Sequence, residues 1–336
     1  MDIDTAMGQF KDDGLLPTKM ESRRVLMSEP RIHAVTCTSP GGLHRMAYYE
    51  WGDADNPDVV VCVHGLTRSG RDFDRLAREL SPRFRVVCPD VVGRGLSEWL
   101  PVPMLYAVPQ YVTDMVTLIA RLRPTTLRWV GTSMGGLIGL GLVGAIAQTK
   151  LRVQRQPPAQ EIQFLPPTDI RFHRMVLNDV GPRIEPVSLV RIGQYLAEPV
   201  AFDSFDQAVT YVKSVSSSFG KLSDELWREF TRHVYIRVDG KWIKHYDPAI
   251  AIPFASMSAE ASRQGEQVLW QAWDAIDCPT LVIRGQDSDL LSSTTLAEML
   301  RRQPLSRARS FADVGHAPSL MVPDQIGAVT EFLNED

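Results

Sequence analysis

The sequence has few cysteines and no surplus of positive charge. Lys and Arg total 36 against 40 Asp and Glu, which gives a formal net charge of −4. A nucleic acid is disfavoured as a partner, because binding phosphates needs a basic surplus. The 4 cysteines form no CxxC pair and no zinc-like spacing, so we expect buried, reduced thiols in a cytoplasmic protein and no metal site. They are Cys37, Cys62, Cys88 and Cys278.

The chain also lacks an apolar N-terminal segment of the kind that directs secretion. Residues 1–30 carry several acidic side chains and are expected to form an N-terminal arm. The longest uncharged stretch, residues 129–147, approaches the length of a transmembrane helix but contains six glycines. We therefore predict a strand, a sharp turn and a fully buried helix there, and no membrane span.

Short apolar runs alternate with amphipathic segments over most of the chain. Strands are predicted at residues 46–51, 59–63, 85–88, 127–130, 175–177, 280–283 and 308–311. Helices are predicted at residues 71–80, 111–122, 294–300 and 323–333, with another starting near Met134. This alternation is typical of an α/β fold with a parallel sheet flanked by helices.

The alternation stops in one segment, residues 182–266. That segment is irregular and rich in scattered aromatic residues, with short helical patterns and no buried strand run. We predict a helical cap inserted into an α/β core formed by residues 31–181 and 267–336. Residues 150–171, which contain two Pro-Pro pairs and many charges, are predicted to be a surface loop.

The sharpest chemical signal is the sequence Gly-Thr-Ser-Met-Gly-Gly at residues 131–136. It lies between a predicted strand and a predicted helix, the context that a nucleophile elbow requires. The serine, Ser133, must occupy a tight turn so that its hydroxyl projects above the sheet. Glycine two residues to either side avoids a clash with the crossing backbone.

A hydroxyl nucleophile needs a base and a carboxylate that orients the base. His316 follows the last predicted strand and has a side chain with a suitable pKa range. Asp287 and Asp289 follow the strand 280–283, at the carboxyl end where open α/β sheets place ligands. The chain order Ser133, Asp289, His316 is the order of one hydrolase fold.

Acyl transfer also needs donors for the negative charge that develops on the carbonyl oxygen. The loop starting at His64 directly follows the strand 59–63. We predict that the backbone N–H groups of Leu66 and Met134 form this oxyanion hole. His64 itself is expected to brace the loop rather than to titrate in catalysis.

The chain resembles the α/β-hydrolase superfamily. The resemblance rests on the His64-Gly65 loop, residues 89–97, the 131–136 elbow, the 285–289 loop and residues 314–318, in that order. It implies an eight-stranded, mostly parallel sheet with a helical lid after strand six. It also implies Ser133 as nucleophile and His316 as base, while Asp90 and Arg94 resemble structural residues of the family.

The position of the acid departs from the commonest family pattern. That pattern places the acid three residues after the glycine, where this chain has Ser288. Related sequences with a Ser-Asp-Leu-Leu segment resemble residues 288–291, which favours Asp289. Asp287 is the second candidate. Asp179 is the third, because some family members carry the acid after strand six.

These features predict a serine hydrolase that cleaves a small or medium-sized carboxylic ester through an acyl-enzyme on Ser133. No cofactor is expected. The elbow and residues 177–182 resemble bacterial intracellular hydrolases, some linked to hydroxyalkanoate oligomers. The alternatives are a carbon–carbon bond hydrolase of aromatic breakdown, an acyltransferase, and a ligand-binding receptor on a hydrolase fold. The expected partner is a small-molecule ester, and a homo-oligomer is left open.

Overall fold

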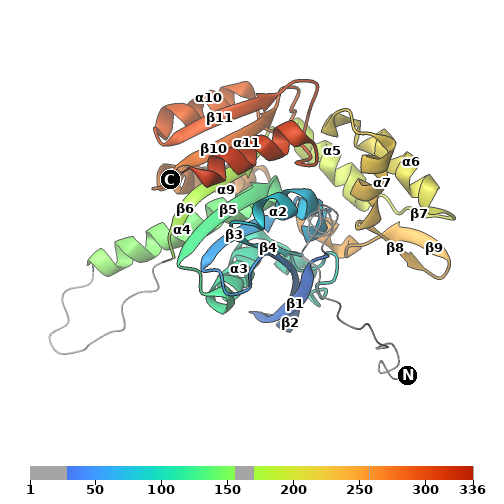
Figure 1. The fold of residues 1–336 in the computed structure, drawn as a ribbon, viewed down its shortest axis with the longest axis horizontal. Helices are drawn as coiled ribbons and strands as arrows, with labels where there is room; N and C mark the ends of the chain where they lie inside the picture. The colour runs from blue at the N-terminus through green and yellow to red at the C-terminus, as the bar shows by residue number, and fades with distance from the viewer. Residues whose placement is uncertain (1–28, 156–169, 257, 336) are drawn as a thin grey trace, which may run out of the picture.

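The computed structural model describes residues 29–155, 170–256 and 258–335, and its centre is an eight-stranded sheet (Figure 1). The strand order is β1-β2-β4-β3-β5-β6-β10-β11. β1 and β2 pair with each other, and β2 with β4, in antiparallel fashion, and all the other neighbours are parallel. The predicted mostly parallel, eight-stranded sheet is therefore confirmed. The bounds are β1 Arg31–Ser39, β2 Gly42–Trp51, β3 Asp58–Val63, β4 Arg85–Pro89, β5 Thr126–Thr132, β6 Phe172–Asn178, β10 Thr280–Gly285 and β11 Ser306–Phe311.

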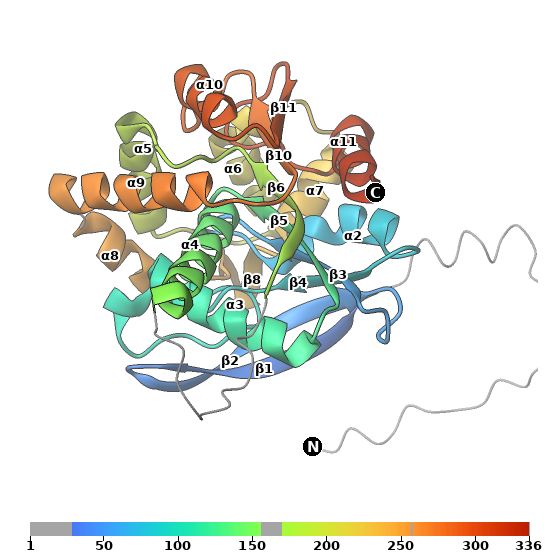
Figure 2. The ribbon, with the colours of Figure 1, turned by 90° about the vertical axis from the view of Figure 1, so that its left-hand side faces the viewer.

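Helices cover both faces of this sheet, which is why its central strands are apolar on both sides (Figure 2). In β3, Val59 and Val61 face the cluster under α3 and α4, whereas Val60 and Cys62 face the cluster under α2 and α11. The helices of the core are α2 Asp74–Leu80, α3 Val108–Leu122, α4 Met134–Arg155, α9 Ala259–Asp274, α10 Ser293–Arg302 and α11 Pro323–Asn334. Short 3-10 turns lie at η1 Gly70–Phe73, η2 Pro103–Leu105, η3 Ser217–Phe219 and η4 Pro248–Ile250.

Residues 182–266, here called the cap insertion, lie between β6 and β10. Besides helices they contain a three-stranded antiparallel sheet in the order β7-β9-β8, which the sequence analysis missed. The strands are only two to four residues long, too short for a clear alternating pattern. A tight turn at Asp239 and Gly240, both with positive φ, joins β8 to β9. The elements are α5 Pro186–Ala197, β7 Ala201–Phe202, α6 Phe205–Val215, α7 Asp224–Arg232, β8 Tyr235–Val238, β9 Lys241–Lys244 and α8 Ala251–Ala255.

The cap insertion has a small apolar core of its own. Trp227, Phe230 and Tyr235 are buried there with side chains of α6, so most cap aromatics serve the fold of the cap. By contrast, Trp270 and Trp273 of α9 pack into the main core. α9 begins inside the predicted cap range and packs against α4, next to it in Figure 2.

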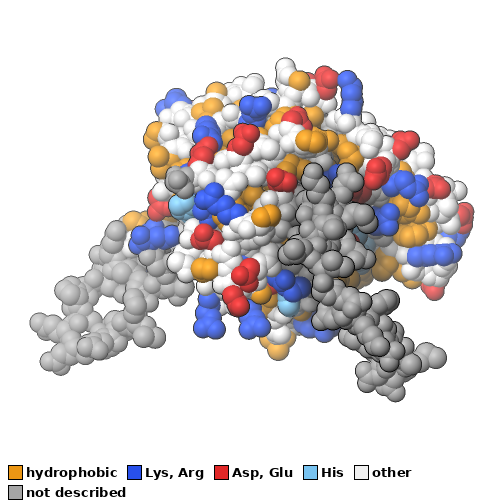
Figure 3. Space-filling model, viewed as in Figure 1, with side chains coloured by type: hydrophobic (Ala, Val, Ile, Leu, Met, Phe, Trp, Pro, Cys, Tyr) orange, Lys and Arg blue, Asp and Glu red, His pale blue; other side chains and the backbone are white. Residues whose placement is uncertain are grey.

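Several smaller predictions can also be compared with the structure. All four cysteines are buried and none forms a disulfide. α4 extends to Arg155, so the start of the predicted loop 150–171 is helical, whereas residues 156–169 and the predicted arm up to residue 28 lie outside the described residues. In the described chain one helix, Met134–Arg152, is long and apolar enough to cross a membrane, a test that core helices also pass. Figure 3 shows acidic and basic side chains interspersed on the visible face.

Candidate active site

Ser133 lies in the sharp turn between β5 and α4. Its φ is +51°, a left-handed conformation that is costly for a residue with a side chain. Its backbone N–H donates to the carbonyl of Asn178 on the neighbouring strand, at 2.9 Å. A Cβ atom at Gly135 would lie 1.9 Å from the carbonyl oxygen of Val63, so only glycine fits this crossing. The predicted strand–turn–helix context of the elbow is therefore present.

The His316 ring meets Ser133 from the loop that follows β11. Its Nε2 lies 2.9 Å from the Oγ of Ser133, within hydrogen-bond distance. The ring is only 10% exposed. The structure thus brings together the two residues that the sequence analysis paired as nucleophile and base, although they are 183 positions apart.

The carboxylate that contacts His316 belongs to Asp179, which follows the last residue of β6. Asp179 Oδ2 lies 2.7 Å from His316 Nδ1, and the side chain is fully buried. The sheet register explains this placement, because Thr132 of β5 pairs with Asn178 of β6. Ser133 directly follows β5 and Asp179 directly follows β6. Both side chains therefore leave the sheet at the carboxyl ends of neighbouring strands.

The prediction of Asp289 as the acid is wrong for this geometry. Its carboxylate forms a two-bond ion pair with Arg191 of the cap insertion, with both N–O distances 2.8 Å, and is 39% exposed. Asp287, the second candidate, is exposed as well. The third candidate, Asp179, takes the position beside the ring.

Ser288 connects the loop after β10 to the candidate active site. Its hydroxyl donates a hydrogen bond of 2.6 Å to Asp179 Oδ2, while the N–H of Gly285 donates to Oδ1 at 3.0 Å. Ser288 occupies the position where the commonest family pattern has the acid. The sequence analysis noted that departure but assigned no role to the serine. Its place three residues after Gly285 was the available signal.

The loop after β3 carries the predicted oxyanion donor Leu66. Leu66 lines the same pocket as Ser133. Met134 is the first residue of α4, and N–H groups at a helix start have no partner within the helix. Leu66 thus lies on a loop beside the serine and Met134 directly follows it, and their role as oxyanion donors stays a prediction.

His64 makes contacts that hold the loop after β3 in place. It is fully buried, its Nδ1 lies 2.7 Å from the carbonyl of Gly65, and its Nε2 accepts a hydrogen bond from the N–H of Val91 at 2.9 Å. Burial lowers the pKa of the imidazole to about 3, so the ring stays neutral. These contacts agree with the predicted bracing role.

Arg94 connects the two sides of the predicted oxyanion hole. Its buried guanidinium donates to the carbonyl of Leu66 at 2.9 Å and contacts the sulfur of Met134 at 3.6 Å. It also donates to the Tyr111 hydroxyl at 3.0 Å. Asp90, fully buried, accepts hydrogen bonds from two backbone N–H groups and from Tyr49, and burial raises its pKa to about 6. Both residues hold loops, in agreement with their resemblance to structural residues.

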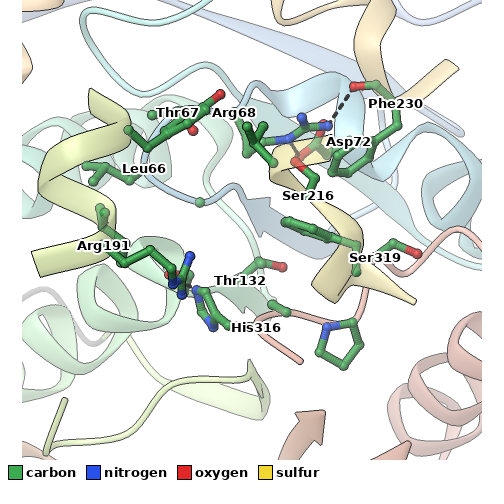
Figure 4. Close-up of a pocket in the computed structure, with 18 of the residues that line it drawn as sticks. Leu66, Thr67, Arg68, Asp72, Thr132, Arg191, Ser216, Phe230, His316 and Ser319 are labelled. Atoms are coloured by element: carbon green, nitrogen blue, oxygen red, sulfur yellow. Dashed lines mark hydrogen bonds and ion pairs between the residues drawn. The ribbon is translucent and has the colours of Figure 1, made fainter. Parts of the chain in front are cut away.

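Ser133 and His316 open into a cavity of about 530 Å³ between the sheet and the cap insertion (Figure 4). The core contributes the Leu66 loop, and the cap insertion contributes apolar and polar side chains from α5, η3 and α7. A volume in this range suits a small ligand. The cap lining includes Arg191, Ile192, Tyr195, Phe219 and Phe230.

The cationic side chains of the cavity wall are already paired. Arg68 binds Asp72 through two contacts of 2.7 Å and lies 3.4 Å from the centre of the Phe230 ring. Arg191 binds Asp289. Of the other cationic side chains of the cap insertion, Lys213 and Lys241 pair with surface aspartates, and the ammonium of Lys244 donates to two backbone carbonyls.

Among the described residues, one group has the composition of a metal site. The candidate ligand atoms of Cys37, His44 and Asp114 lie within 4.8 Å of one another, and all three residues are buried away from the cavity. Asp114 already contacts His44 at 3.1 Å and Gln110 at 2.8 Å. Burial raises the pKa of Cys37 to about 12, which disfavours the thiolate that a metal needs. The group fits a hydrogen-bonded part of the core better than a metal centre.

Comparison with known proteins shows the family to which this chain belongs. The model of the alpha/beta hydrolase family matches residues 60–329, and the chain belongs to this family. A 3-hydroxybutyrate-oligomer hydrolase of Cupriavidus necator is 47% identical over 92% of this chain and 99% of that protein. The matches establish a hydrolase of carboxylic esters, the class that the sequence analysis predicted.

Solved structures support the same fold. A putative hydrolase from Rickettsia typhi superposes with a TM-score of 0.76 at 29% identity, covering 91% of this chain and 99% of that one. An alpha/beta hydrolase from Novosphingobium aromaticivorans gives a TM-score of 0.74 at 30% identity with the same coverage.

Proposed function

We propose that this enzyme hydrolyses the ester bonds of short 3-hydroxybutyrate oligomers. The observation that carries the proposal is the 47% identity, over nearly the full length of both chains, to a hydrolase named for that substrate. The Ser133–His316–Asp179 arrangement and the 530 Å³ cavity support it, because a short oligomer is a small molecule with ester carbonyls along its length.

The reaction begins when Ser133 Oγ attacks an ester carbonyl. His316 Nε2 removes the hydroxyl proton as the new carbon–oxygen bond forms, and Asp179 orients the ring and stabilises the imidazolium. The N–H groups of Leu66 and Met134 hold the negative oxygen of the tetrahedral intermediate.

The intermediate then breaks the bond to the leaving alcohol. His316 donates its proton to the leaving oxygen, and an ester of Ser133 remains. Water attacks that ester, with His316 again taking the proton, and the acid is released as Ser133 recovers its hydrogen. The cap insertion forms part of the wall of the cavity in which both steps take place. The cytoplasmic location stays a prediction, and a homo-oligomer stays open.

The test is hydrolysis of 3-hydroxybutyrate dimer and trimer by the wild type and Ser133→Ala, with released 3-hydroxybutyrate measured. Ser310→Ala, at an exposed position on β11, is the matched control. We expect turnover by the wild type and the control and none by Ser133→Ala. A series of p-nitrophenyl esters from acetate to decanoate then measures the acyl length that the cavity accepts. A wild type that cleaves these esters but neither oligomer would contradict the proposed substrate.

A further inference from the structure

Arg191 is the cation of the cavity wall that is best placed to change partner. It projects from α5 of the cap insertion and lines the same cavity as His316 (Figure 4). Its partner Asp289 follows Ser288, whose hydroxyl binds Asp179, the residue that contacts His316. The guanidinium is therefore anchored beside the network that orients the base.

The ion pair of Arg191 with Asp289 is half exposed. The two side chains are 48% and 39% exposed, and an ion pair of this kind contributes little net stability because water screens it. A planar guanidinium that already holds one carboxylate by two hydrogen bonds has the geometry to hold another. If the pair opens, Asp289 returns to water at small cost.

Arg68, the other arginine of the cavity wall, is a poorer candidate. Its side chain is 12% exposed, it binds the partly buried Asp72, and it also donates to the backbone carbonyl of Phe230 at 2.8 Å (Figure 4). Replacing these partners would leave Asp72 without its cation, and such a change is costly. Arg68 therefore links the loop after β3 to the cap insertion. Arg191 is the arginine of the cavity wall that can bind a ligand.

Because Arg191 and His316 line the same cavity, the role of His316 indicates which part of a substrate Arg191 would meet. His316 donates its proton to the leaving oxygen, so groups near the ring face the leaving alcohol rather than the acyl chain. In a 3-hydroxybutyrate oligomer, the last leaving alcohol is 3-hydroxybutyrate itself. Only two carbon atoms separate its oxygen from a free carboxylate, which places that charge close to the imidazole.

We propose that Arg191 binds the terminal carboxylate of the oligomer, so that the enzyme removes 3-hydroxybutyrate units one at a time from the acid end. This inference rests on the proposed function. Cleavage then transfers the shortened, hydroxyl-terminated chain to Ser133. The leaving oxygen takes its proton from His316, and the released unit keeps its carboxylate on Arg191 until it dissociates. Arg191 is thus a specificity-determining residue, and it takes no part in bond making.

The first experiment compares one substrate in two charge states, the 3-hydroxybutyrate dimer as free acid and as its methyl ester. For Arg191→Gln we expect kcat/KM on the free acid to fall about 10- to 100-fold, mainly through KM. The methyl ester should be hydrolysed as by the wild type. Arg183→Gln is the matched control, because Arg183 forms an ion pair of similar exposure with Glu266 and does not line the cavity.

The second experiment follows the direction of cleavage with a trimer whose acid-end unit carries an isotope label. The proposal predicts labelled monomer and unlabelled dimer as the first products of the wild type. Labelled dimer as the first product would overturn it, and so would an equal loss on both substrates in Arg191→Gln. These outcomes are distinct from failure of the proposed function, in which the wild type hydrolyses neither dimer nor trimer.

Discussion

Ser288 donates a hydrogen bond of 2.6 Å to the carboxylate of Asp179, the group that contacts His316. The serine stands on the loop where the commonest family pattern carries the acid itself. In this chain the carboxylate comes from the end of β6 instead, and the loop after β10 supplies a donor to it. One buried network therefore contains both positions from which a carboxylate could reach the base.

The hydrogen bond between Ser288 and Asp179 predicts that a carboxylate at position 288 can partly replace the one at position 179. Asp179→Asn should lose most activity, and adding Ser288→Asp should restore a measurable part of it, because the new carboxylate lies in the same network. Ser288→Asp alone should lower kcat, since it places two carboxylates side by side. Steady-state hydrolysis of a p-nitrophenyl ester by the three variants provides the measurement. A double variant no more active than Asp179→Asn would contradict this prediction.

Arg94 should matter for the rate although it lies outside the reacting atoms. Arg94→Lys removes the fork that binds the carbonyl of Leu66 and the Tyr111 hydroxyl together. A shift of the oxyanion loop should lower kcat about 10- to 100-fold with a smaller change in KM. Arg301→Lys, at an exposed position of α10, is the control. Equal kcat values for Arg94→Lys and the wild type would show that Leu66 is held by other contacts.

His64 should make the free energy of unfolding depend on pH. Its folded pKa of about 3 lies below the ordinary value of 6.5, so the unfolded chain binds more protons between these values. The stability that His64 contributes is complete above pH 6.5 and falls as the pH decreases toward 3. Denaturant unfolding of the wild type and His64→Gln should therefore show a stability difference that narrows from pH 7 to pH 4. Asp90 titrates in both proteins, so its contribution largely cancels from the stability difference between them. A constant difference would contradict a neutral, buried His64.

The close approach of Gly135 to the backbone of β3 can be tested by substitution. Gly135→Ala would place a methyl group 1.9 Å from the Val63 carbonyl oxygen, so the backbone must shift and the fold should lose several kcal/mol. Gly265→Ala on the exposed side of α9 meets no atom within 4 Å and should stabilise by about 0.5–1 kcal/mol. Thermal unfolding of the two variants distinguishes the cases. A stable Gly135→Ala would argue against the tight crossing.

The features that the sequence predicted well are local. The elbow at Ser133 combines a strand, a turn and a helix within a few residues, and its glycines follow from sterics at that place. His64, Asp90 and Arg94 belong to short loops directly after strands. Each of these patterns carries its own physical reason, so the family and most of the sheet could be predicted from it.

The features that were missed depend on contacts between distant segments. Asp179 and Asp289 both follow buried strands, and only the placement of each loop decides which carboxylate faces His316. The ion pair with Arg191 could not be predicted, because it depends on how α5 crosses the loop after β10. The small sheet of the cap insertion was missed because a two-residue strand such as β7 has no periodicity to detect.

The central claim is that Asp179, rather than Asp289, is the carboxylate that serves His316. The most direct measurement is kcat for hydrolysis of a neutral p-nitrophenyl ester by Asp179→Asn and Asp289→Asn. The account predicts a loss of about 10³- to 10⁴-fold for Asp179→Asn, because the amide no longer holds the ring in the required tautomer. It predicts a kcat near wild type for Asp289→Asn, together with a lower KM for the free-acid dimer because Arg191 is released. A large loss of kcat in Asp289→Asn, together with a kcat near wild type in Asp179→Asn, would contradict the central claim.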